Sequence, residues 1–305
     1  MFGAPAKVLL LALTAELLLS SVDMRAAEST TNSALAQFNF EFRQGNLMVP
    51  LRINDSKQLA FKLDTGFGVT TIHPELVESL QLNRMGTITI IGIAGEEEST
   101  TYRGAKFDFS GVTYSPRYVV AIPSEAKRQR RTRDGILGAG FFRRFVVEID
   151  PEKRVMTLHD PEKFTYSGRG EVVPLSFRKD TPIVEAAINF TNRESVQARY
   201  EIDSGCDGEL CLGHDFVKNN RLDEDTGTGG RGARSGVGGS VGTRHGVLPE
   251  FQLGQQKLER LPANFFQNGS PVGEGLAGHI GMGTLRHFKV IFDYSRRRMI
   301  LELLK

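Results

Sequence analysis

The chain has 305 residues, of which 40% are hydrophobic and 24% charged, and its formal net charge is +2. This composition is ordinary for a soluble globular protein with one large or two modest domains, and it indicates no fibrous or disordered class. The nearly balanced charge argues against a dedicated nucleic-acid binder. We interpret the basic cluster at residues 127–133 as a solvated loop, with a polyanion site or a proteolytic nicking site as alternatives.

Residues 1–27 are predicted to be a signal peptide. The apolar run from Val8 to Val22 has the length of a signal-peptide core and falls short of the roughly 20 uninterrupted apolar residues of a membrane span. We therefore expect an exported protein, periplasmic or secreted. Glu16 interrupts the run and no clean cleavage site follows, so an uncleaved leader that acts as a membrane anchor is the alternative.

A polar segment at residues 28–36, rich in Ser, Thr and Asn, is predicted to be a disordered linker. Residues 37–160 then have the pattern of a lobe made mainly of strands, since Phe38, Phe40 and Phe42 alternate with polar residues. The other elements expected in this lobe are strands at 47–53, 58–63, 87–91, 99–103, 106–109 and 118–122, and a short helix at 74–80.

The strand at 58–63 leads directly into the triplet Asp64-Thr65-Gly66. Glycine removes the Cβ penalty of a tight turn, and the threonine hydroxyl can hydrogen-bond locally, so such a turn presents its acid instead of burying it. Alone, the triplet is also typical of any hairpin loop.

Three landmarks of the first half recur in the same order in the second half, which indicates an internal duplication. They are the acid triplet, a glycine-bearing hairpin tip, and a glycine-framed apolar segment followed by a hairpin that turns at an aspartate. We therefore predict a hinge at 161–170 and a second, homologous lobe at 171–305. The matching landmarks are Asp64-Thr65-Gly66 with Asp203-Ser204-Gly205, Gly92-Ile93-Ala94-Gly95 with Gly236-Val237-Gly238-Gly239, Gly135 with Gly278, and Asp150 with Asp293.

Each hairpin tip could fold over a cleft as a flap, because glycine permits left-handed turns and the mobility that a lid needs. For residues 92–95, a plain solvent-exposed hairpin is the alternative. In the second half, nine of the twenty residues from 227 to 246 are glycine. That composition does not hold a rigid packed element by itself, so we expect either a long mobile flap or a disordered loop.

The two cysteines, Cys206 and Cys211, follow the second acid triplet. Five positions along a strand-like segment would put their side chains far apart and on opposite faces. We therefore expect two free thiols, Cys206 near the cleft and Cys211 in the core. Neither lies at a spacing from histidines or acids that suits zinc, and no metal site is predicted.

The paired motifs resemble those of the aspartic proteases, from about residue 38 to the C-terminus. Each half looks like one subunit of a retropepsin-type dimer, and the whole looks like a pepsin-style two-lobed single chain. The resemblance implies an all-β fold with few short helices, in which two closed-barrel-like lobes are related by a pseudo-twofold axis. It also implies a monomer that needs no cofactor.

By this resemblance Asp64 and Asp203 would form the catalytic dyad. Thr65 and Ser204 would hydrogen-bond across the pseudo-twofold axis, and the later Ile-Leu-Gly type segment would pack against the acid loop. Gly66 and Gly205 would leave room for the backbone to approach a substrate. An extended polypeptide would lie between the dyad and the flap residues 92–95 and 236–239.

Two carboxyl groups in one cleft share a proton, so one can act as base and the other as acid towards a bound water that attacks the peptide carbonyl. The sequence does not assign the two roles, because such a pair titrates as a unit. An exported aspartic endopeptidase is the leading hypothesis.

Two other hypotheses remain open at this stage. Phe67 and Cys206 stand where a small residue usually follows the triplets, and this favours an inactive, peptide-binding pseudo-protease as the alternative. A third interpretation, of two tandem β domains with ordinary surface turns, predicts carboxylates that lie far apart.

Overall fold

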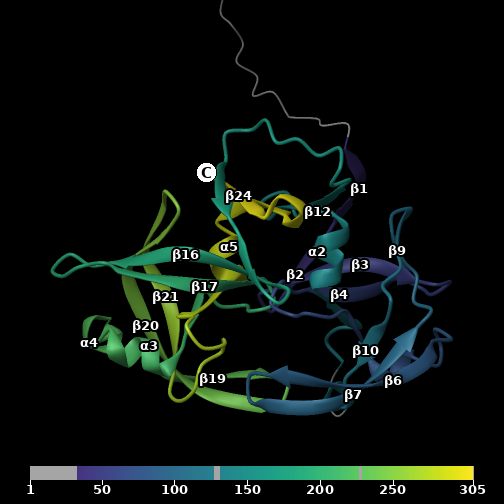
Figure 1. The fold of residues 1–305 in the computed structure, drawn as a ribbon, viewed down its shortest axis with the longest axis horizontal. Helices are drawn as coiled ribbons and strands as arrows, with labels where there is room; N and C mark the ends of the chain where they lie inside the picture. Colours follow the sequence, from purple (N-terminus) through teal and green to yellow (C-terminus); the bar gives the residue numbers. More distant parts are fainter. Residues whose placement is uncertain (1–32, 127–130, 227–228, 305) are drawn as a thin grey trace, which may run out of the picture. The chain divides into compact units, whose positions relative to one another are not determined.

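Strands dominate the fold, as the alternating sequence pattern predicts. The computed structural model describes residues 33–126, 131–226 and 229–304 (Figure 1). The predicted signal peptide and the centre of the basic cluster lie outside these residues. Within the described ranges, no helix is long and apolar enough to cross a membrane.

A ten-stranded sheet, called here the first sheet, contains the first acid triplet and runs in the order β6-β7-β10-β5-β11-β4-β3-β8-β9, with β2 beside β3. Its strands are β2 (Glu41–Arg43), β3 (Asn46–Ile53), β4 (Leu59–Leu63), β5 (Thr71–Ile72), β6 (Asn83–Gly92), β7 (Gly95–Arg103), β8 (Phe107–Phe109), β9 (Val112–Tyr114), β10 (Val119–Ala121) and β11 (Gly135–Leu137).

An eight-stranded sheet, the second sheet, contains the second triplet and runs in the order β15-β16-β17-β22-β18-β21-β20-β19. Its strands are β15 (Ser176–Arg178), β16 (Thr181–Asn189), β17 (Val196–Asp203), β18 (Leu210–Leu212), β19 (Arg231–Gly236), β20 (Gly239–Leu253), β21 (Gln256–Phe266) and β22 (Gly278–Gly281). β16 also pairs with β20, so this sheet curls back on itself.

A six-stranded sheet, the shared sheet, joins the two halves of the chain in the order β1-β13-β12-β23-β24-β14. The junction is the antiparallel pair β12–β23, in which Val147 lies opposite Phe292. Residues 161–170, the predicted hinge, contain no helix or strand. The strands of this sheet are β1 (Ala34–Asn39), β12 (Val146–Asp150), β13 (Val155–His159), β14 (Glu171–Pro174), β23 (Phe288–Asp293) and β24 (Arg298–Leu303).

The helices are short and lie between strands. They are η1 (Pro74–Leu76), α1 (Pro123–Ala126), α2 (Ala139–Arg144), α3 (His214–Asn219), α4 (Leu222–Asp225), α5 (Met282–Leu285) and η2 (Tyr294–Arg296).

One buried hydrophobic cluster extends through the first and second sheets and beneath both triplets. In β4, Leu59, Phe61 and Leu63 are buried while the residues between them are partly exposed, so alternate side chains enter the core. Lys62 and Asp64 therefore leave the backbone on the other side, away from the core. Glu201 and Asp203 do the same in β17, where Tyr200 and Ile202 are buried.

Two sequence-based expectations need correction, and one open alternative is decided. Residues 34–36, expected in the linker, begin β1, because the alternating segment pairs with β13. The helix expected at 74–80 is only the 3₁₀ turn η1. For the described residues of the glycine-rich stretch, the structure excludes the disordered loop and fits the flap: β19 and β20 form a hairpin in full register with its tip at 236–239, and β20 continues alongside β21. Backbone hydrogen bonds to a long neighbouring strand supply the order that the glycine side chains do not.

Candidate active site

Both acids lie at the end of a strand that has a parallel neighbour. β4 runs parallel to β11, and β17 runs parallel to β22. The amide N–H of Asp64 donates to the carbonyl of Leu137 in β11 at 3.0 Å, while Asp203 lies in register with Gly281 of β22. The glycine-framed segments therefore hold the acid turns.

These segments need glycine where they touch the loops after the triplets. A Cβ on Gly138 would lie 2.3 Å from the carbonyl oxygen of Val69, and one on Gly281 would lie 2.1 Å from that of Gly208. The packing of this segment against the acid loop, implied by the resemblance, is present in both halves.

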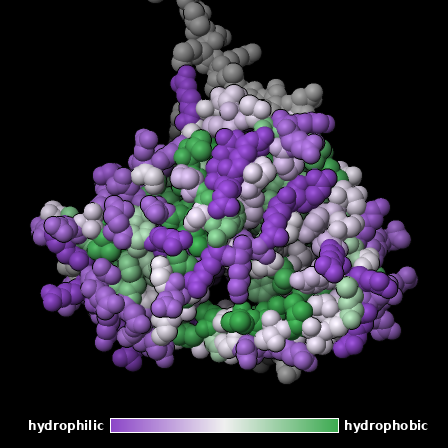
Figure 2. Space-filling model, in the orientation of Figure 1, coloured by the Kyte–Doolittle hydropathy of each residue, from purple (hydrophilic) through white to green (hydrophobic). Residues whose placement is uncertain are grey.

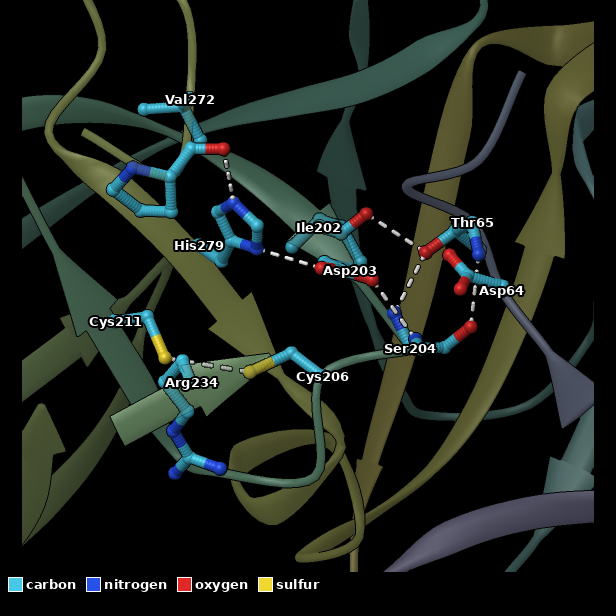
Figure 3. Close-up of polar contacts among 12 residues, drawn as sticks. Asp64, Thr65, Ile202, Asp203, Ser204, Cys206, Cys211, Arg234, Val272 and His279 are labelled. Carbon is cyan, nitrogen blue, oxygen red and sulfur yellow. Dashed lines mark hydrogen bonds and ion pairs between the residues drawn. The ribbon is translucent and has the colours of Figure 1, made fainter. Parts of the chain in front are cut away.

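The two acid turns are joined by reciprocal hydrogen bonds (Figure 3). The amide of Thr65 donates to Ser204 Oγ at 3.0 Å, and the amide of Ser204 donates to Thr65 Oγ1 at 2.9 Å. Each hydroxyl in turn donates to a carbonyl behind the opposite acid, Thr65 to Ile202 at 2.7 Å and Ser204 to Leu63 at 3.2 Å. Both side chains are fully buried. The expected cross-connection is therefore present.

The glycines of the triplets each face the opposite acid. A Cβ on Gly205 would lie 2.0 Å from Asp64 Oδ2, and a Cβ on Gly66 would lie 2.7 Å from Asp203 Cγ. The two carboxyl groups thus meet in one place, each against the glycine of the opposite triplet. This geometry excludes the interpretation in which the acids belong to separate surface turns.

The two carboxyl groups have different electrostatic surroundings. Burial and then the charge of Asp203 raise the pKa of Asp64 to about 6, against a smaller lowering by Lys62. Burial also acts to raise the pKa of Asp203, but the charge and hydrogen bond of His279 outweigh it and bring that pKa to about 2. Between these values the pair carries one proton, and the unequal surroundings favour Asp64 as the protonated member.

Sequence reasoning missed His279 and Lys62. His279 Nδ1 lies 2.6 Å from Asp203 Oδ2, and Lys62 Nζ lies 3.5 Å from Asp64 Oδ2. A signal for Lys62 was present, since a side chain two residues before an acid in a strand shares its face. The signal for His279 was the comparison of Gly278-His279-Ile280-Gly281 with Gly135-Ile136-Leu137-Gly138, in which an imidazole replaces an aliphatic side chain.

The two predicted flap tips touch one another. The amide of Ala94 donates to the carbonyl of Val237 at 3.2 Å, and Val237 packs against an apolar cluster of the first half that includes Ile90. The hairpins β6–β7 and β19–β20 meet at their tips, at the bottom of the view in Figure 1. Hydrophobic residues gather along this band, and a narrow opening lies above it (Figure 2).

The tips meet too closely for side chains at several positions. A Cβ on Gly92 would lie 2.4 Å from Val237 Cβ, and one on Gly238 would lie 2.3 Å from the Gly95 amide nitrogen. A Cβ on Gly236 would lie 2.7 Å from Ile93 Cγ2, while one on Gly239 would lie at an ordinary 3.6 Å from Ala94 Cβ. All the predicted tip residues thus lie at a single junction of the two hairpins.

The prediction for the cysteine side chains is wrong in its geometry. Both thiols are free, and Cys211 is buried, but Cys206 Sγ lies only 3.4 Å from Cys211 Sγ. The segment between them is not a straight strand, since β18 begins only at Leu210 and the residues before it turn. No cluster of three or more metal-binding side chains occurs among the residues that the structure describes.

Comparisons with known proteins agree with this geometry. Residues 49–141 match the family described as aspartyl protease. Among solved structures, the aspartic proteinase from Irpex lacteus is similar, with a TM-score of 0.59 over 88% of this chain and 97% of that chain, at 14% sequence identity. A comparison with curated protein sequences found no match.

Proposed function

We propose, from the match of residues 49–141 to the aspartyl protease family and the likeness of the fold to an aspartic proteinase, that this chain is an endopeptidase with Asp64 and Asp203 as its catalytic dyad. The single observation that carries the proposal is the meeting of the two acid turns. Each triplet glycine lies against the opposite carboxyl group, and the surroundings raise the pKa of Asp64 to about 6 and lower that of Asp203 to about 2.

A pair with one proton can serve both halves of peptide hydrolysis. The ionised carboxylate takes a proton from a water molecule, whose oxygen then attacks the peptide carbonyl, while the protonated carboxyl donates to the carbonyl oxygen. The dyad of pepsin-like enzymes is the established example of such a pair, in which like charges a short distance apart cannot both ionise. This mechanism uses no cofactor.

The proposed substrate is an extended polypeptide bound between the dyad and the flap tips at 92–95 and 236–239. An extended chain can add to exposed strand backbone through main-chain hydrogen bonds, with side-chain pockets giving preference. We also propose that the protein acts as a monomer, because one chain supplies both acids. Export, as a periplasmic or secreted enzyme, is proposed from the apolar leader alone.

Cleavage of a peptide library or of casein by the purified protein tests this function. Asp64→Asn and Asp203→Asn should each lower kcat/KM by a factor on the order of 100 or more, because each removes one partner of the acid–base pair. Asp215→Asn, in an exposed position on α3, is the matched control and should leave cleavage unchanged.

Full cleavage by either dyad variant would refute the proposal. If the wild-type protein binds peptides but never cleaves them, the inactive peptide-binding alternative replaces it. Thermal unfolding of each variant distinguishes loss of catalysis from loss of the fold.

A further inference from the structure

The backbones around the two acids match, but their side chains do not. In the first sheet, Lys62 of β4 lies in register with Ile136 of β11. In the second sheet, the equivalent strands place Glu201 in register with His279. A cation and an aliphatic group at one acid thus correspond to an anion and an imidazole at the other.

The hydrogen bonds of His279 constrain its protonation. Nδ1 faces Asp203 Oδ2 at 2.6 Å, and Nε2 faces the carbonyl oxygen of Pro271 at 2.9 Å. A carbonyl oxygen can only accept, so Nε2 carries a proton. Nδ1 then shares a second proton with Asp203 Oδ2, and the ring is an imidazolium wherever that carboxyl group is ionised. Although burial acts to lower it, the charge of Asp203 raises the pKa of His279 to about 10.

Asp203 has both oxygens engaged by donors. Its Oδ2 faces the imidazolium, and its Oδ1 accepts the amide N–H of Gly205 at 2.9 Å. Hydrogen bonds to the charged form of a carboxylate favour that form. The cation nearest Asp64 is Lys62, at the longer distance of 3.5 Å.

The other charged groups around the two acids do not reverse this difference, in which Asp203 has the stronger stabilisation of its ionised form. Beside His279, burial raises the pKa of Glu201 against the lowering effect of His279 and of Arg178. On the opposite side, Arg133 adds only a small lowering to the pKa of Asp64. Cys206 stays a neutral thiol near Asp203, since its hydrogen bond with Cys211 and its burial raise its pKa.

We propose that His279 is a positioning residue that keeps Asp203 as the ionised member of the dyad, so that Asp203 is the general base and Asp64 the general acid. This inference rests on the proposed function and adds the assignment of roles that the sequence could not make. Asp203 takes one proton from water as the new C–O bond forms, and Asp64 gives one proton to the carbonyl oxygen. When the C–N bond breaks, Asp203 passes its proton to the leaving nitrogen and Asp64 recovers its own from the diol, so the dyad returns to its starting state.

The pH dependence of kcat/KM tests the assignment. In the wild-type enzyme the acidic limb should reflect Asp203 and lie near pH 2, the pKa that His279 imposes. His279→Gln removes the cation but keeps a hydrogen-bonding side chain, so the pKa of Asp203 should rise. The acidic limb should then move up by about one to three pH units, while cleavage at the new optimum persists. His287→Gln, at an exposed histidine, is the control and should leave the limb in place.

A second measurement does not depend on turnover. Nitrogen chemical shifts of histidine-labelled protein should show His279 doubly protonated at pH 8, where an ordinary histidine with a pKa of about 6.5 is neutral. In Asp203→Asn the ring should become neutral at that pH. A neutral His279 ring in the wild type at pH 8, or an acidic limb unmoved in His279→Gln, overturns the inference.

The two proposals fail in distinguishable ways. If both dyad variants abolish cleavage but His279→Gln leaves the acidic limb unmoved, the protease proposal stands and the assignment falls. If cleavage survives the dyad variants, the protease proposal falls, and the role of His279 in catalysis falls with it even where the imidazolium is observed.

Discussion

The two acid turns differ in charge far more than in shape. Both end a strand with a parallel neighbour, both use a buried hydroxyl residue to bind the opposite turn, and both place a glycine against the opposite acid. Yet Asp64 has the ammonium group of Lys62 at 3.5 Å, while Asp203 has the ring of His279 at 2.6 Å.

This difference separates two requirements on the site. Bringing the carboxyl groups together needs the same small residues and the same backbone hydrogen bonds on each side. Placing the single proton on one of the two carboxyl groups needs an unequal electrostatic field. A few side chains supply this field without disturbing the backbone. The shape can therefore stay nearly symmetric while the chemistry is asymmetric.

The largest loss of activity should come from a substitution that disturbs the close approach of the two acid turns. Gly205→Ala would place a methyl group 2.0 Å from Asp64 Oδ2, so the buried carboxyl group must move. A misplacement of about 1 Å can reduce activity on the order of 100-fold. We expect this loss in kcat/KM for Gly205→Ala and a somewhat smaller one for Gly66→Ala, where the contact is 2.7 Å.

Gly68 offers the matched control for these two variants. A Cβ there meets nothing within 4 Å, so Gly68→Ala should retain activity. Equal activities for all three alanine variants would show that the close approach of glycine and acid is not required.

The hydroxyl groups of Thr65 and Ser204 should contribute equally to the free energy of unfolding. Thr65→Val leaves the buried amide of Ser204 without its acceptor, and Ser204→Ala does the same to the amide of Thr65. Each change should lower the free energy of unfolding by about 1–3 kcal/mol, the usual effect of leaving a buried polar group unpaired. Denaturant unfolding of each variant measures this.

The double variant sharpens that comparison. Because the two hydroxyl groups form one network, the effects of Thr65→Val and Ser204→Ala should not add. Strict additivity, or a destabilisation confined to one side, would contradict the reciprocal arrangement.

The smallest effect should come from removing Lys62, which lies farther from its acid than His279 does. Lys62 lowers the pKa of Asp64, which stands at about 6, so Lys62→Met should raise that pKa further. Asp64 would then keep its proton to higher pH, and the alkaline limb of kcat/KM should move up by up to about one pH unit. Lys57→Met, at an exposed lysine in the turn before β4, should not move the limb. A downward shift in Lys62→Met would contradict the assigned role of Asp64.

Sequence reasoning was most accurate where the contacts follow from local, repeated motifs. The acid triplets, the hydroxyl residues beside the acids and the glycine-framed segments recur in both halves, so the partners of one half could be inferred from the other. His279 lies 76 residues from Asp203, and only the register of β17 with β22 brings the two together. No local pattern encodes that register.

The error about the cysteines and the undecided alternatives for the glycine-rich stretch have a common physical origin. The cysteine geometry was predicted for a straight strand, but Cys206 lies in the turn before β18. The glycine-rich stretch was judged on side chains alone, whereas β19 and β20 are held by backbone pairing with a neighbour. In both cases the path of the backbone, which composition does not specify, determined the outcome.

The shared sheet predicts how the protein would respond to cleavage of the peptide link between its two halves. Each half contributes three strands, and the halves meet in the continuous pairing of β12 with β23, while the covalent link between them at 161–170 has no regular structure. A single nick in that link would leave the pairing of β12 with β23 and the reciprocal Thr65–Ser204 contacts intact. The fragments should therefore stay associated, and could be produced as separate polypeptides that reassemble into one folded unit.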